Sequence, residues 1–239
     1  MTKLSVNINK LATIRNSRGG NNPDVIAYAK KIESYGAQGI TIHPRPDQRH
    51  IRFDDVYALK NVVQTEYNIE GYPSEEFIRM VIEVMPTQVT LVPDPPDVLT
   101  SNNGWDTIAH QSFLKDVIGR FKEAGIRTSI FLNPDINMLE SAQSTGTDRI
   151  ELYTEAYASA FKADKEKAIA PYLETAIAAN SIGIGLNAGH DLDLDNLKYF
   201  ATTIPNLLEV SIGHALICDA LEFGMSNTVK IYLNQLKDS

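Results

Sequence analysis

The chain has 239 residues, of which 43% are hydrophobic, and a formal net charge of −8 at pH 7. This length suits one (β/α)8 barrel, and the apolar share is enough for a sizeable core. The acidic balance argues against nucleic acid as the main partner, and no apolar run is long enough to cross a membrane. The start of the chain lacks the apolar segment of a signal peptide, so we expect a cytoplasmic protein.

Short apolar runs alternate with longer amphipathic segments along the chain. They predict strands at residues 4–7, 39–43, 67–70, 88–92, 127–132, 149–153, 182–186 and 208–212. Helices are predicted at residues 24–35, 54–65, 74–84, 111–124, 135–143, 164–180, 194–200 and 215–236. This alternation favours an α/β fold, a single TIM barrel of parallel strands that forms one catalytic domain over residues 1–239. A doubly wound open sheet is the alternative, although it usually has a Gly-rich turn after its first strand, where this chain lacks one.

Polar residues of a catalytic kind follow the predicted strands. Asn7 and Glu70 end two of them, and His43, His190 and His214 stand directly at or after three others. In such barrels the chemistry lies at the carboxyl ends of the strands. Imidazoles titrate near neutral pH, and burial beside an apolar strand raises the pKa of a carboxylic acid. This pattern predicts a proton-transfer site, although each residue alone could serve as a hydrogen-bonded or salt-bridged structural group.

Two features indicate small phosphorylated substrates. Gly189 and Gly213 follow the last two strands, where many barrels bind a phosphate through backbone N–H groups. Alternatively, these two glycines serve only to form tight turns. Basic residues form one group at Lys10, Arg15 and Arg18 and another at Arg45, Arg49, His50 and Arg52. Each group taken alone also fits a solvated surface.

Three other features leave more than one reading. Glu151, between two apolar residues, is expected to point into the barrel, where it either assists catalysis or orients a histidine or lysine. The long segment 93–105, with Thr100, fits a lid that binds hydroxyl groups or a surface turn. The single cysteine, Cys218, excludes an internal disulfide, and its apolar neighbours predict a buried structural thiol in preference to a nucleophile.

Metal binding is not indicated, because the chain has no HxH, HExxH or cysteine-rich spacing. A metal held by His43, Glu70 and His190 is the alternative, since the carboxyl ends of barrel strands converge. We therefore expect no metal at the site.

Six segments match those of a known family in order and spacing: VNINKLATIRNSRGG (6–20), GITIHPRPDQRHI (39–51), NIE (68–70), LVP (91–93), LNAGHDL (186–192) and EVSIGHAL (209–216). Over nearly its whole length the chain resembles pyridoxine 5'-phosphate synthase. The resemblance implies a transferase that condenses 3-amino-2-oxopropyl phosphate with 1-deoxy-D-xylulose 5-phosphate. Closure of the pyridine ring by acid/base catalysis then gives pyridoxine 5'-phosphate, phosphate and water, with no cofactor. It also implies a homo-oligomer, an octamer built from dimers.

The resemblance assigns roles to single residues. His43 and Glu70 match proton acceptors, and His190 matches a proton donor. The matches to contacts with the amino-ketone phosphate are Asn7, Arg18, Asp191, Gly213 and His214. The matches to contacts with the deoxyxylulose phosphate are Asn9, Lys10, Arg45, His50 and Thr100.

This chain departs from the family pattern at two places. Many members have Asp-His where this chain has Asn9 and Lys10, and many have Gly where it has Asp191. Lys10 can supply the charge of the missing histidine, and Asn9 can keep a hydrogen bond. The backbone N–H of Asp191 can bind phosphate if its carboxylate points away, whereas an inward carboxylate would repel it. The competing functions are another phosphosugar aldolase or isomerase on the same barrel and a non-catalytic barrel that binds phosphorylated metabolites.

Overall fold

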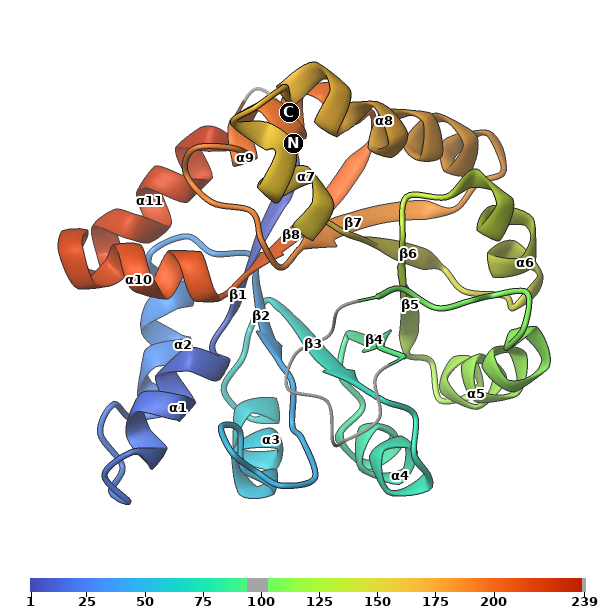
Figure 1. Cartoon of the computed structure of the whole chain (residues 1–239). Helices are drawn as coiled ribbons and strands as arrows, with labels where there is room; N and C mark the ends of the chain where they lie inside the picture. The colour runs from blue at the N-terminus through green and yellow to red at the C-terminus, as the bar shows by residue number, and fades with distance from the viewer. Residues whose placement is uncertain (94–102, 238–239) are drawn as a thin grey trace.

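The computed structural model describes residues 1–93 and 103–237. Its strands close into a barrel in which every strand runs parallel to its neighbours and β1 pairs with β8 (Figure 1). The strands are β1 (Lys3–Asn7), β2 (Gly39–Ile42), β3 (Glu66–Gly71), β4 (Gln88–Leu91), β5 (Arg127–Leu132), β6 (Arg149–Tyr153), β7 (Gly185–Gly189) and β8 (Leu207–Ile212). The prediction of a (β/α)8 barrel is therefore confirmed, and the open sheet is excluded.

Helices surround the barrel, as Figure 1 shows. They are α1 (Asn9–Asn16), α2 (Val25–Ser34), α3 (Phe53–Lys60), α4 (Glu75–Val84), α5 (Gln111–Glu123), α6 (Leu139–Ser144), α7 (Glu155–Phe161), α8 (Lys165–Ser181), α9 (Leu197–Thr203), α10 (His214–Phe223) and α11 (Met225–Gln235), with a 3-10 turn at Ile136–Met138. The side chains of Asp24 and Ser74 cap α2 and α4 by accepting from backbone N–H groups. Within the described ranges, no helix combines the length and the apolar character needed to span a bilayer.

The strands bury two chemically different faces. Apolar residues such as Leu4, Val6 and Ile40 alternate with polar residues and are fully buried. The polar set bonds from strand to strand, as in the 2.7 Å contact between the hydroxyls of Ser5 and Thr41. Because successive side chains point to opposite faces, the apolar set packs under the helices and the polar set fills the barrel. The interior can therefore place ionisable groups beneath the site.

One predicted strand is shifted along the chain. The sequence predicts the seventh strand at residues 182–186, but β7 covers Gly185–Gly189. Ile182 instead caps α8, and Gly183 turns the chain with a φ of 79°. The apolar residues around Gly183 therefore end a helix, and Asn187 belongs to the barrel rather than to the loop after it.

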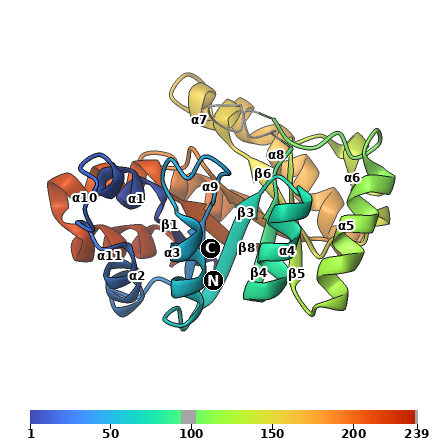
Figure 2. The same cartoon turned by 90° about the horizontal axis from the view of Figure 1, so that it is seen from below.

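The helix predictions also need correction. Neither α1 nor α7 is predicted, and the single helix expected at 215–236 is two helices separated by Gly224, whose φ is 74°. Helix α1 lacks a clean apolar stripe because its buried face includes Arg15. Figure 2 shows that the short helix α7 lies toward the end of the barrel at which the strands finish. Cys218 is exposed on α10, so the prediction of a buried thiol is wrong; Leu216 and Ile217 are the buried residues of that helix.

Candidate active site

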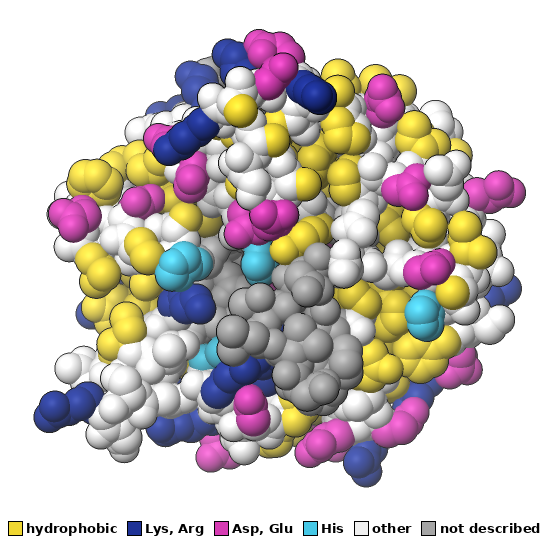
Figure 3. Space-filling model, viewed as in Figure 1, with side chains coloured by type: hydrophobic (Ala, Val, Ile, Leu, Met, Phe, Trp, Pro, Cys, Tyr) yellow, Lys and Arg dark blue, Asp and Glu magenta, His cyan; other side chains and the backbone are white. Residues whose placement is uncertain are grey.

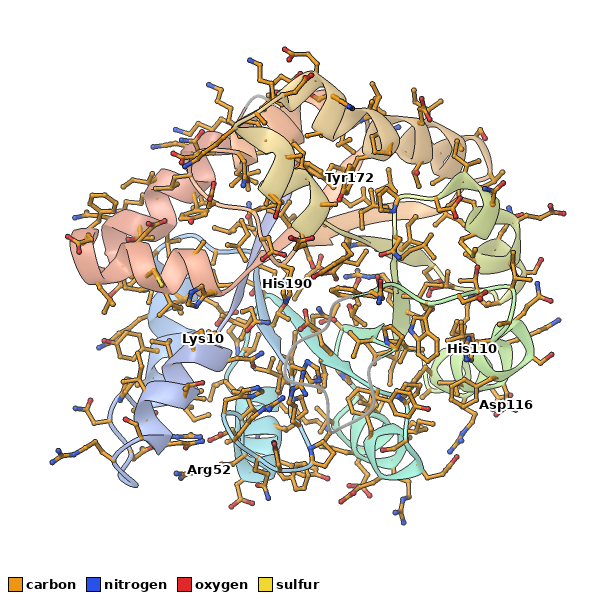
Figure 4. The ribbon with its side chains drawn as sticks, in the orientation of Figure 1. Lys10, Arg52, His110, Asp116, Tyr172 and His190 are labelled. Atoms are coloured by element: carbon orange, nitrogen blue, oxygen red, sulfur yellow. The ribbon has the colours of Figure 1, made fainter. Side chains whose placement is uncertain are left out.

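A cavity of about 710 Å³ opens where the strands end. Nearly all of the predicted site residues line it: Asn7, Asn9, Lys10, His43, Arg45, His50, Glu70, Glu151, His190, Asp191, Gly213 and His214. Histidine and basic side chains gather near the centre of this face of the molecule (Figure 3). In Figure 4 the side chains of Lys10, from α1, and His190, after β7, both lie on the barrel side of the helices.

Other predicted residues lie elsewhere. Arg18 is exposed in the turn after α1 and does not line the cavity. Arg15 is only 1% exposed and bonds to Asp55, so it is a buried structural cation. Arg52 stands before α3, outside the cavity lining (Figure 4). Thr100 lies outside the residues that the structure describes.

Asparagines connect the ends of the first three strands. The amide of Asn7 donates to Glu70 Oε2 at 3.3 Å, and its oxygen accepts from the backbone N–H of Asn9 at 3.0 Å. The oxygen of Asn9 in turn accepts from the backbone N–H of His43 at 2.9 Å. The side-chain oxygen of Asn9 therefore holds the segment that carries His43, and any contact with a substrate would fall to its amide nitrogen.

Two histidines on this side of the cavity are neutral at physiological pH. Burial, followed by the charge of Arg45, lowers the pKa of His43 to about 3 and that of His50 to about 4; Arg49 adds to both shifts. The backbone N–H of Ile51 donates to His50 Nδ1 at 3.0 Å. The neutral ring of His50 thus carries its proton on Nε2. These two imidazoles and the arginines form a region suited to an anionic group.

Carboxylic acids occupy the floor of the cavity and the barrel below it. Burial raises the pKa of Glu70 to about 7, although the nearby His190 opposes the shift. Glu151 is 2% exposed, and burial together with Glu70 and Glu209 raises its pKa well above the usual range. Its Oε2 atom has no hydrogen-bond partner within the described structure. As predicted, Glu151 points into the barrel, where its surroundings favour the neutral acid over the carboxylate.

The ends of β7 and β8 form the part of the cavity wall that adjoins the end of β1. A Cβ atom at Gly189 would lie 2.2 Å from the carbonyl oxygen of Ser211, and one at Gly213 would lie 3.0 Å from Cβ of Asn7. Close packing therefore requires glycine at 189, whereas a Cβ at Gly213 would need Asn7 to give way by a few tenths of an ångström. Gly213 also precedes α10 without a side-chain cap, so N–H groups at this helix start face the cavity region.

Sequence reasoning missed several residues that line the cavity, namely Thr13, Val92, Phe131, Tyr153, Glu155 and Ser211, and it treated Arg49 only as part of a basic group. Tyr153 and Ser211 could have been found, because they share the inward face with Glu151 and Gly213 two residues away. Thr13 and Glu155 could not, since helices α1 and α7 were not predicted. Within residues 1–93 and 103–237, no three His, Cys, Asp or Glu side chains come together as a metal-binding group.

A parallel barrel with imidazoles, a carboxylic acid of raised pKa and arginines around one cavity defines a barrel enzyme equipped for proton transfer beside anionic groups. A model of the family described as pyridoxal phosphate biosynthesis protein PdxJ matches residues 4–238. Relatives named pyridoxine 5'-phosphate synthase include those of Cytophaga hutchinsonii, 61% identical over 99% of this chain and the full length of the relative, and Phocaeicola vulgatus, 60% identical over the same shares. The chain belongs to this family.

Solved structures of other enzymes share the barrel. One is 3-keto-L-gulonate-6-phosphate decarboxylase from Vibrio cholerae, with a TM-score of 0.66 and 12% identity over 98% of this chain and 97% of the other. Another is N-(5'-phosphoribosyl)anthranilate isomerase from Pyrococcus furiosus, with a TM-score of 0.64 and 10% identity over the whole of both chains. At such identities the likeness shows the fold alone.

Proposed function

We propose that the protein condenses 3-amino-2-oxopropyl phosphate with 1-deoxy-D-xylulose 5-phosphate to form pyridoxine 5'-phosphate, phosphate and water. The observation that carries this proposal is the convergence of His43, Glu70 and His190 on one cavity of a member of the family. The reaction is a series of proton transfers, and the pKa of His43 is lowered whereas those of Glu70 and His190 are raised. The polar interior and the closed barrel support action by residues 1–239 as one catalytic domain.

His43 and Glu70 would accept protons, and His190 would donate one. A pKa of about 3 makes His43 a weak base, and part of that shift comes from Arg45 and Arg49. An anionic phosphate bound to those arginines would offset their charge and raise the pKa of His43 toward neutrality. Binding of the deoxyxylulose phosphate would thus activate the base that acts on it.

The two phosphates would occupy different parts of the cavity. Arg45, His50, Lys10 and the amide of Asn9 would bind the deoxyxylulose phosphate, since they lie together on the side of α1 and the β2 loop. The start of α10, with Gly213 and His214, and the nearby Asn7 would bind the amino-ketone phosphate. Contacts of Arg18 with the amino-ketone phosphate and of Thr100 with the deoxyxylulose phosphate are proposed from the resemblance to the family alone. We further propose action in the cytoplasm as a homo-oligomer, an octamer built from dimers.

The decisive experiment mixes the two substrates with the purified protein and measures pyridoxine 5'-phosphate and phosphate. We expect both products in equal amounts, and no product where a known synthase is active would contradict the proposal. His43→Ala and Glu70→Gln should each lower kcat at least about 100-fold with an unchanged fold, in line with loss of a general base. Full activity of both variants would remove their roles. Binding without turnover would instead favour a non-catalytic barrel.

A further inference from the structure

The residue after His190 is an aspartate whose carboxylate bonds to the imidazole. Asp191 Oδ2 lies 2.9 Å from His190 Nδ1. An ionised carboxylate only accepts hydrogen bonds, so Nδ1 carries a hydrogen and Nε2 is the nitrogen left for other partners. The two side chains are 38% and 35% exposed. Both line the cavity, so the pair is open to a substrate without being fully solvated.

The backbone holds this pair in place. His190 has a φ of 67°, the left-handed region that non-glycine residues rarely adopt. Its N–H donates to the carbonyl of Ser211 at 3.2 Å, and the N–H of Asp191 donates to the carbonyl of Gly189 at 3.0 Å. The hydroxyl of Thr154 donates to that same carbonyl. A conformation of this kind persists only where the surroundings fix it, and here the three hydrogen bonds hold the segment that carries both side chains.

The same contacts disfavour phosphate binding by Asp191. Its N–H already donates to Gly189 and, at 3.4 Å, to Thr154 Oγ1. Its carboxylate would repel an anion that approached it directly. We propose that Asp191 is a positioning residue for His190, whose Nδ1–H it holds so that the protonated imidazole presents Nε2–H to the substrate. The inference rests on the proposed function, in which His190 donates a proton.

The charges around His190 support this assignment. Burial alone lowers the pKa of His190, and Lys10 on α1 acts in the same direction. The hydrogen bond and charge of Asp191, together with the charge of Glu70 on β3, outweigh both and raise the pKa. His43 also lies within electrostatic reach, and the Tyr153 ring on β6 is 5.6 Å from the imidazole centroid. Loss of the hydrogen bond and charge of Asp191 would therefore lower the pKa of His190, so the imidazole would hold its proton less tightly.

The test compares Asp191→Asn with the parent by NMR titration of histidine-labelled protein and by the pH profile of kcat. We expect the proton affinity of His190 to fall about tenfold, and the high-pH limb of the kcat profile to move to lower pH by a matching amount. The KM for the amino-ketone phosphate should change less than about threefold. The matched control is Asp195→Asn, which removes the same charge from an exposed residue that pairs with Lys162; it should shift neither readout.

An unchanged His190 titration in Asp191→Asn would overturn the inference. So would a changed KM with an unmoved pH profile, because a substrate-binding residue behaves in that way. If Asp191→Asn fails to fold, Asp191→Glu takes its place. This variant keeps the carboxylate at a changed distance, and the proton affinity of its His190 should fall below that of the parent by less than about tenfold. The titration needs no turnover, so it tests the pair even if the unmodified protein makes no pyridoxine 5'-phosphate, the outcome that would contradict the proposed function.

Discussion

His43 and His190 line one cavity, yet their neighbours move their pKa values in opposite directions. Burial and then Arg45 lower the pKa of His43, whereas Asp191 and Glu70 raise that of His190. A neutral and a protonated imidazole can therefore be present at the same pH, as a sequence of proton uptake and release requires. The contrast depends on single neighbouring residues, so one substitution can remove it.

Lys10 is a single charge at the cavity whose contribution to substrate binding can be tested. Its ammonium is exposed, lines the cavity from the first turn of α1 and lowers the pKa of both His50 and His190. Lys10→Met should raise the KM for 1-deoxy-D-xylulose 5-phosphate about 10-fold or more, because a charge-assisted contact contributes about 1.5–3 kcal/mol. Steady-state kinetics would show it, with kcat changed much less. Lys30→Met, on the exposed face of α2, is the control; equal kinetics for the two variants would exclude a role for Lys10.

At the scale of elements, hydrogen bonds connect α1 to the loop that carries the residues predicted to bind the deoxyxylulose phosphate. Arg15 donates to both oxygens of Asp55, at 2.6 and 2.8 Å, and to the carbonyl of His50 at 3.0 Å. The amide of Asn16 donates to the same carbonyl at 2.7 Å. Asp55 also accepts from the backbone N–H of Arg52 at the start of α3. One ion pair thus sets the distance between α1, α3 and the loop between β2 and α3.

Two adjacent aspartates allow a matched test of this ion pair. Asp55→Ala leaves Arg15 buried without its carboxylate and should destabilise the protein by about 3 kcal/mol or more, as broken buried pairs do. Asp54→Ala removes an exposed acid from the same helical turn and should cost less than about 1 kcal/mol. Urea unfolding measures both. A similar loss for the two variants would show that the helix dipole, not the buried pair, is what the first turn of α3 needs.

The sequence predicts elements well where one face is apolar and poorly where a buried face is polar. The strand at Arg149–Tyr153 has the predicted bounds, because apolar residues flank Glu151. Helix α1 is not predicted because Arg15 occupies its buried face. The shift of β7 arises because the apolar residues around Gly183 fit the end of a helix as well as the start of a strand. The sequence predicts which residues share the cavity, because they follow the ends of the strands. It does not predict the hydrogen bond between His190 and Asp191, which depends on a left-handed backbone conformation that no sequence pattern specifies.

At the scale of the whole molecule, the barrel encloses acids instead of a purely apolar core. Glu70, Glu151 and Glu209 are each buried at 8% exposure or less, and burial raises the pKa of all three. Burial disfavours the charged carboxylate of each group, so each one resists ionisation. The arrangement keeps protons available below the cavity, and it links catalysis to the stability of the fold.

Glu70→Gln should therefore stabilise the protein at high pH while lowering its activity. The pKa of Glu70 in the folded state is about 7, above its ordinary value of 4.5, so the folded state binds more protons than the unfolded state between these values. Stability is then lost as pH rises through this window. Glutamine carries no charge, and its oxygen can still accept from Asn7, so the gain at pH 8 should be on the order of 2 kcal/mol and should shrink toward pH 5.

Thermal unfolding at both pH values measures this difference, which corresponds to a Tm increase of about 4–8 °C at pH 8 for a chain of this size. Glu174→Gln, an exposed position on α8, makes the same chemical change and should leave Tm nearly unaltered. A Glu70→Gln protein that is less stable than its parent at pH 8 would mean that the ionised carboxylate is well paired in the fold. Higher stability with lost turnover would instead show that the barrel keeps a destabilising acid because the reaction needs it.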